Sequence, residues 1–413
     1  MSAPPTAPAS ARTGYRQVLA VPEFRALFAA HVLSLLGMVV SEIALSVLVY
    51  DLTASPLMSA LAFAVGFLPY ALGGTLLAPV ADRFPARRVL VVCDLVCAAC
   101  VAVMVVPGTG VAVLLALRCG VAVVSPVFSG TRMATLADVL GDGDAFVLGR
   151  SLIRIVSQSA LLVGYATGGL LLTVVSPRHA LLITVGTFLA SAALLRFGTR
   201  RRPARGRAER AEGGGTLVLL RNRRVLVLLL VFWVPAMFLV FPEALAAPYS
   251  HTLGAGSTGL GLLMCALPVG TIAGELFAGA RLGAATRERI VLPLLCLAVV
   301  PYLGYALAPG LWPSLLLLVL AGACSAYTLG LDQWFVRAVP EELRGRAMTL
   351  LSAGLMTIQG VGMALAGVVA EVMGVRAAVV AAGVVGTVCC VGLAVGCRVT
   401  ESRDGAARDM TGR

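Results

Sequence analysis

The sequence predicts an all-α integral membrane protein with twelve transmembrane helices in two six-helix bundles, and three observations carry this prediction. Of the 413 residues, 59% are hydrophobic and 13% are charged, whereas about a quarter are charged in soluble domains. The apolar residues form long runs, and about 20 of them cross the hydrocarbon core of a bilayer. A basic, glycine-containing segment divides the runs into two sets of six. This composition excludes soluble enzymes, nucleic-acid-binding proteins and disulfide-stabilised secreted domains.

Charged residues and turn residues set the approximate limits of the runs. The predicted spans are 24–50, 56–80, 88–106, 110–128, 147–175, 178–197, 225–246, 258–280, 290–307, 313–336, 346–372 and 375–397. The segment 1–22 is rich in Pro, Ala and Ser, and we expect it to be a disordered cytoplasmic N-terminus rather than a cleaved signal peptide. The predicted domains are then a first bundle at 23–197, a basic linker at 198–224, a second bundle at 225–399 and a cytoplasmic tail at 400–413.

The positions of the arginines predict the orientation in the membrane. All 32 basic residues are arginine, which we interpret as the mark of a GC-rich bacterial genome. With both termini in the cytoplasm, every arginine except Arg118, Arg178 and Arg376 lies in a cytoplasmic segment or at the adjoining end of a span, as the positive-inside rule requires. The lipid bilayer thus explains the net charge of +12 without a nucleic-acid partner. We expect a multi-pass protein of the bacterial inner (plasma) membrane.

The loop between the second and third spans carries a motif. It reads Ala78-Pro-Val-Ala-Asp82-Arg83-Phe-Pro85-Ala86-Arg87-Arg88. This resembles the signature of the major facilitator superfamily, although Ala78, Pro85 and Ala86 stand where that family usually has Gly, Gly and a basic residue. The resemblance implies that Asp82 engages the N-terminal end of the eleventh helix, where the helix dipole favours a carboxylate, and that Arg83, Arg87 and Arg88 stabilise one gate state. The alternative is an ordinary charged cytoplasmic turn.

Two further stretches resemble the same superfamily. Residues 340–346, before the eleventh span, are similar to a loop of bacterial members and would supply the partner helix of Asp82. In the fifth span, Gly164, Gly168 and Gly169 resemble the glycine-rich motif of drug:proton antiporters, with Tyr165 where that motif usually has proline. Small residues four apart also allow close packing of helices, which is a complete structural explanation. Over residues 20–400 the pattern is similar to actinobacterial efflux proteins.

Two ionisable residues lie deep inside predicted spans, where a charge is costly and marks a candidate functional site. Glu42 precedes the external end of the first span by eight residues, and Arg118 follows the external start of the fourth by eight. At about 1.5 Å per residue, both lie about 12 Å below the same boundary. The resemblance implies that both helices line a central cavity. The pair is therefore either a proton-coupling switch, which we favour, or a fixed structural ion pair.

Other polar residues in the spans have two interpretations each. Asp94, near the cytoplasmic face, belongs either to the Asp82–Arg83 cluster, which we favour, or to the cavity. Glu243 is a second acidic group at the cavity mouth or an interfacial carboxylate. The remaining candidates either contact substrate or form helix–helix hydrogen bonds; they are His31, Gln158 and Gln359.

The sequence favours a transporter over an enzyme. A chain without lysine has no Walker lysine, no His/Cys spacing predicts a metal site, and no cofactor is expected. We expect a monomer that exports a small hydrophobic or amphipathic compound, an antibiotic or secondary metabolite, in exchange for protons. The alternatives are an importer, siderophore carrier or lipid carrier of the same fold, and a membrane sensor or catalyst built on a transporter scaffold.

Overall fold

The computed structural model describes residues 15–70, 83–141, 144–202, 219–339 and 343–411, and these residues form helices joined by short turns. The first half of the chain contains α1 (Tyr15–Ala20), α2 (Pro22–Thr53), α3 (Pro56–Phe67), α6 (Ala86–Val105), α7 (Val111–Leu140), α8 (Asp144–Val174) and α9 (Pro177–Gly198).

The second half opens with α11 (Arg223–Leu239) and two short helices, α12 (Phe241–Ala244) and α13 (Ala246–Thr252). It continues through α14 (Gly256–Arg281), α15 (Ala284–Leu297), the 3-10 helix η1 (Val300–Leu307), α16 (Leu311–Cys324), α17 (Tyr327–Ala338), α18 (Arg344–Met373) and α19 (Val375–Thr411).

Within the described residues, ten helices are long and apolar enough to cross a membrane. The second and fifth predicted spans are represented by shorter apolar helices, Pro56–Phe67 and Ser159–Val174. The chain is therefore a multi-pass helical membrane protein, and the number twelve stays a prediction.

Local sequence explains where several helices begin. Prolines occupy the first turn of α2, α3 and α9, where the missing N–H group has no helical partner to lose. Ser55 caps α3 by accepting a hydrogen bond from the Met58 N–H at 3.3 Å, and Asn222 caps α11 in the same way. Capping residues of this kind satisfy N–H groups that a helix leaves unpaired.

Three segments differ from the prediction. Residues 15–20, expected within the disordered N-terminus, form α1, because Val18 packs into a cluster with Phe24 and Leu27. Helix α7 continues to Leu140 rather than ending near residue 128, and Thr131, Arg132 and Thr135 of this extension are buried rather than solvated. The expected tail continues α19 as far as Thr411.

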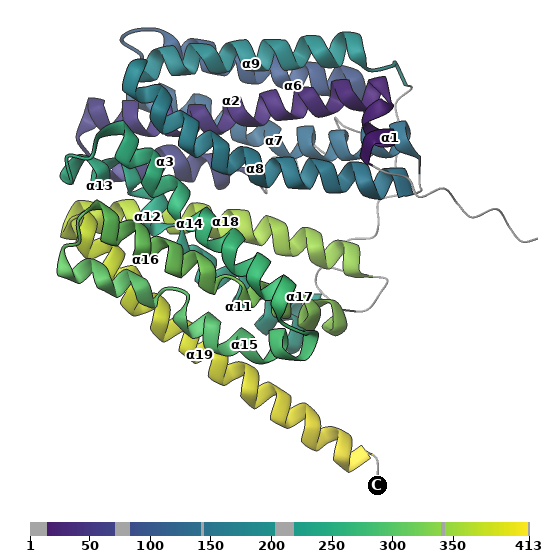
Figure 1. Ribbon diagram of the computed structural model, residues 1–413, viewed down its shortest axis with the longest axis vertical. Helices are drawn as coiled ribbons and strands as arrows, with labels where there is room; N and C mark the ends of the chain where they lie inside the picture. The colour runs from purple at the N-terminus through teal and green to yellow at the C-terminus, as the bar shows by residue number, and fades with distance from the viewer. Residues whose placement is uncertain (1–14, 71–82, 142–143, 203–218, 340–342, 412–413) are drawn as a thin grey trace, which may run out of the picture.

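The two halves of the chain form two groups of helices, which lie one above the other in Figure 1. In the first group α9 packs against both α2 and α6, and in the second α14 packs against α16 and α11 against α18. The groups join mainly where α8 packs against α14 and α3 against α18, and α12 and α13 of the second half also contact α3. The short helices α12 and α13 lie between the groups at the left of the view.

Glycine allows a close approach between the groups at α8 and α14. A Cβ atom on Gly169 of α8 would lie 2.5 Å from the Gly261 Cα of α14, which is far inside van der Waals contact. Close by, Ser257 donates a hydrogen bond to the Leu172 carbonyl at 3.2 Å. At this point α8 and α14 are in backbone contact, as small residues permit in membranes.

A matched pair of substitutions tests this contact. Gly169→Ala and Gly186→Ala each gain up to about 1 kcal/mol of helix propensity, and a Cβ on Gly186 meets no atom within 4 Å. We expect the melting temperature of the purified protein in detergent to fall for Gly169→Ala and to stay constant or rise for Gly186→Ala. Equal changes in both variants would contradict the close packing of α8 on α14.

Candidate functional site

A buried ion pair joins α2 and α7. The guanidinium of Arg118 donates a hydrogen bond to the Glu42 carboxylate. The side chains of Arg118 and Glu42 are 4% and 12% exposed, so neither charge is balanced by bulk water. A buried ion pair is strongly disturbed when one partner is removed, because the other charge stays behind unpaired.

A glycine of the neighbouring helix α3 leaves space for this arginine. A Cβ atom on Gly66 would lie 2.9 Å from Arg118 Cζ, so only glycine leaves room for the guanidinium. Arg118 Nε is buried and has no hydrogen-bond partner among the described residues.

A second buried contact crosses between the two halves. The Tyr165 hydroxyl of α8 donates a hydrogen bond of 2.5 Å to Glu243 Oε1 of α12. Tyr165 is buried, and Glu243 is half-buried. A hydrogen bond to a carboxylate is about twice as strong as one between neutral groups, so this contact is a specific link between the halves.

The two contacts form one electrostatic unit. The Glu42 carboxyl group lies within electrostatic range of both Glu243 and Tyr165. Helices α2, α7, α8 and α12 thus bring two carboxyl groups, one guanidinium and one phenol together. We call Glu42, Arg118, Tyr165 and Glu243 the central cluster.

A further polar contact crosses the halves near the beginning of α3. Glu371 Oε2, near the end of α18, accepts hydrogen bonds from Ser55 Oγ at 2.8 Å and from the Leu57 N–H at 3.3 Å. The carboxylate thus lies at the N-terminus of α3, where the helix dipole favours it. This contact is a further link between the two halves, in addition to those of Gly169 and Tyr165.

His31 belongs to a separate buried network. Arg132 of α7 donates a hydrogen bond to His31 Nδ1, and His31 Nε2 lies 2.8 Å from Ser157 Oγ. The Ser157 hydroxyl donates its own proton to the Ile153 carbonyl at 2.8 Å, which leaves His31 Nε2 as the donor to serine. The geometry fits a neutral imidazole that fixes α2 to α7 and α8.

Asp94 lies in the same region of the first half. It accepts hydrogen bonds from Ser191 at 2.5 Å and from Ser34 at 3.4 Å, and it interacts electrostatically with Arg132. Its described partners are therefore serines of α2 and α9 rather than Arg83. Arg132 also lies over the Phe128 ring, 4.1 Å from the ring centre.

The remaining predicted site residues belong to other parts of the chain. Asp82 and residues 340–342 of its predicted partner loop lie outside the described residues, as does the Gln158 side chain. Arg83 is exposed, Arg87 donates to the Thr199 carbonyl at 3.0 Å, and Arg88 lies over the Phe84 ring. Gln359 Oε1 is buried without a hydrogen-bond partner in the described part of the chain.

The glycines of α8 have distinct neighbours. Cβ atoms on Gly164 and Gly168 would lie 2.7 Å and 2.8 Å from Val39 and Ile43 of α2, whereas Gly169 faces α14 of the other half. The motif therefore packs α8 against both groups of helices.

Two residues of these networks were not singled out as site residues in the sequence. Tyr165 was noted only as a departure from a motif, although a tyrosine in place of proline adds a hydroxyl that can bond across helices. Arg132 follows the predicted end of the fourth span, because the polar residues around it are typical of a loop rather than of a membrane helix.

No group of three or more His, Cys, Asp or Glu side chains in the described residues is placed to hold a metal ion.

The chain belongs to the transmembrane secretion effector family of major facilitator-type transporters, whose sequence profile matches residues 16–412. No curated protein matches it in sequence.

Solved transporter structures share the fold. A bacterial homologue of the human lysosomal transporter Spinster, inward-facing and occupied, is 15% identical with a TM-score of 0.70, and the match covers 94% of this chain and 98% of that one. The nucleoside transporter NupG (D323A mutant) is 14% identical with a TM-score of 0.70, covering 91% and 99%. An inward-facing bacterial homologue of the iron transporter ferroportin is 15% identical with a TM-score of 0.68, covering 90% and 98%. These likenesses show a common fold.

A double-mutant cycle tests the link across the halves. Tyr165→Phe leaves the Glu243 carboxylate without its donor, and Glu243→Gln weakens the bond by removing the charge. Because hydrogen bonds to charged groups contribute about 1.5–3 kcal/mol, we expect each substitution to lower the thermal stability and the double variant to lose less than the sum. Additive losses in thermal unfolding experiments would mean that Tyr165 and Glu243 do not interact.

Proposed function

We propose that this chain is a proton-coupled secondary transporter, with twelve transmembrane helices in two six-helix bundles, that exports a small hydrophobic or amphipathic compound by alternating access. In this proposal the two shorter apolar helices, Pro56–Phe67 and Ser159–Val174, belong to the two spans that bring the ten longer ones to twelve. The observation that carries the proposal is the central cluster, whose carboxyl groups lie on opposite sides of the boundary between the halves.

Charge balance explains why such a cluster would bind a proton. Glu42 and Glu243 supply two carboxyl groups, and Arg118 supplies one guanidinium. With both carboxyl groups ionised, one negative charge is left without a cation, and unbalanced charge inside a membrane is costly. One proton or one cationic ligand removes the imbalance, so the two compete for the same cluster.

The Tyr165–Glu243 bond couples this binding to movement. When Glu243 is ionised, the charge-assisted bond holds the halves together and the empty transporter cannot change state. A proton or a substrate bound at Glu243 weakens the bond, and the two halves can then move relative to each other. Only one of the two ligands can bind at a time. A transporter that moves only when it carries one of two competing ligands is an antiporter.

The family to which the chain belongs supports the direction of transport. The description of the family as a secretion effector favours export. We assign the opposite gate, the one on the cytoplasmic side, to the loop after the second span, where Asp82 would bind the start of α18, with Arg83, Arg87 and Arg88 in support. The solved relatives carry different cargoes in one fold, so the substrate is a property of the residues between the halves and not of the fold.

Proton flux in proteoliposomes tests the proposal. A pH gradient is imposed, and hydrophobic cations, neutral macrolide-like compounds and siderophores are added in turn. We expect one compound class to trigger proton flux in the wild-type protein. Glu243→Gln should lose this flux, because its neutral side chain can no longer exchange a proton for the compound. Glu42→Gln should lose the flux as well.

Glu288→Gln is the matched control, because Glu288 pairs with Arg337 at 2.9 Å outside the cluster. This variant should keep the wild-type flux. Unchanged flux in Glu42→Gln and Glu243→Gln would contradict the role of the cluster. Folded wild-type protein that shows no flux with any compound would contradict proton coupling.

A further inference from the structure

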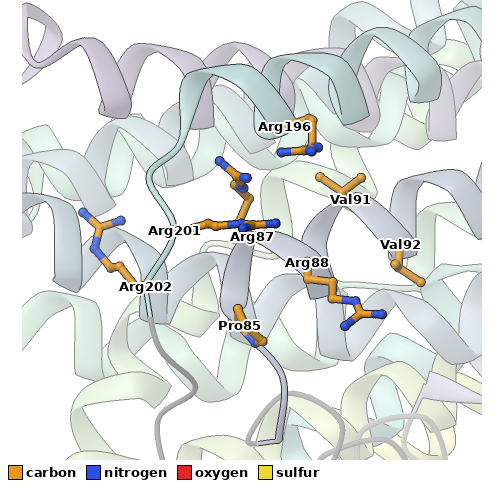
Figure 2. A pocket seen from close by; sticks show the side chains of 8 residues that line it. All are labelled: Pro85, Arg87, Arg88, Val91, Val92, Arg196, Arg201 and Arg202. Carbon is orange, nitrogen blue, oxygen red and sulfur yellow. The ribbon is translucent and has the colours of Figure 1, made fainter.

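Five arginines surround a pocket at one end of the first half. The pocket has a volume of about 560 Å³, within the range of about 300–1,000 Å³ that is usual for small-ligand sites. Its walls come from the start of α6 and from the end of α9 with the residues that follow it (Figure 2). The lining residues are Pro85, Arg87, Arg88, Val91, Val92, Arg196, Arg201 and Arg202.

Only one of these arginines has a carboxylate partner in the described residues. Arg202 binds Glu23 through two hydrogen bonds, of 2.6 Å and 2.9 Å, which raise the pKa of the Arg202 guanidinium. Arg196 and Arg201 repel Arg87 electrostatically, and Figure 2 shows Arg87 beside Arg201, below Arg196. The pocket is therefore a site of concentrated positive charge.

The chain holds these like charges together by fixed contacts. Glu23 accepts a third hydrogen bond, from the Arg200 N–H at 2.8 Å, and so anchors the segment that carries Arg201. The Thr199 carbonyl accepts the hydrogen bond of Arg87. Arg201 and Arg87 are thus positioned close to each other although their charges repel, which is the arrangement expected of a site for an anion.

The pocket has an apolar side as well. Val91 and Val92 line it. Leu95 and Val96 lie on the same face of α6 as Val92, because they are three and four residues further along the helix. Val92, Leu95 and Val96 are 49%, 45% and 39% exposed. Because α6 and α9 are candidate membrane spans, this face borders the hydrocarbon core, and the arginines lie at the level of the headgroups.

We propose that this pocket binds the headgroup phosphate of an anionic phospholipid, with its acyl chains along the exposed face of α6. Guanidinium groups bind phosphate oxygens in pairs, and basic pockets between spans on the cytoplasmic side suit anionic lipids. The arginine distribution places this end of the chain in the cytoplasmic leaflet. The proposal is independent of the transported compound.

Native mass spectrometry of the purified full-length protein tests the proposal. The protein is equilibrated with equal amounts of phosphatidylglycerol and phosphatidylcholine of identical acyl chains. We expect bound phosphatidylglycerol to exceed bound phosphatidylcholine in the wild type, and this preference to fall several-fold in R196Q/R201Q. These arginines lie outside the proposed gate and are exposed, so the variant should keep the melting temperature of the wild type.

The matched control is R223Q/R224Q, which removes two exposed arginines at the start of α11 that do not line the pocket. It should keep the lipid preference. An unchanged preference in R196Q/R201Q, or an equal loss in both double variants, would overturn the proposal. Glycerol phosphate added as a soluble competitor separates lipid from free phosphate: binding of glycerol phosphate without a preference for phosphatidylglycerol would overturn the assignment to a lipid.

Discussion

The hydrogen bond between Tyr165 and Glu243 is the contact on which the proposed coupling between the two halves depends. It joins α8 of the first half to α12 of the second, in a place where an ionised carboxyl group needs a partner because water is excluded. The backbone contact of Gly169 with Gly261 lies on the same helix α8 and brings the halves close enough for the bond to form. The packing of α8 on α14 thus brings the Tyr165 hydroxyl within reach of the Glu243 carboxylate.

The two buried networks of the first half have different characters. The central cluster reaches the second half and contains more carboxyl groups than guanidinium groups. The network of His31, Arg132 and Asp94 stays within one group of helices, and each of its members has a hydrogen-bond or electrostatic partner. The second network therefore fits a structural role: it fastens α7 to α2, α6, α8 and α9 within the first half.

The sequence predicted those features that follow from composition and regular helix geometry. Ten candidate spans follow from apolar runs, and the placement of Glu42 and Arg118 at one depth follows from the rise of a helix; their hydrogen bond agrees with that placement. Tyr165–Glu243 could not be predicted, since no local pattern shows which faces of distant helices meet. Arg132 was missed because buried polar residues in α7 resemble the end of a span.

Hydrogen–deuterium exchange of the protein in lipid nanodiscs tests the central claim most directly. Peptides from 159–174 of α8 and from 256–270 of α14 report on the contact between the halves. We expect faster exchange in both peptides for Glu243→Gln than for the wild type at the same pH, with no change for Glu288→Gln. Identical exchange in the wild type and Glu243→Gln would contradict the claim that the charge on Glu243 holds the halves together.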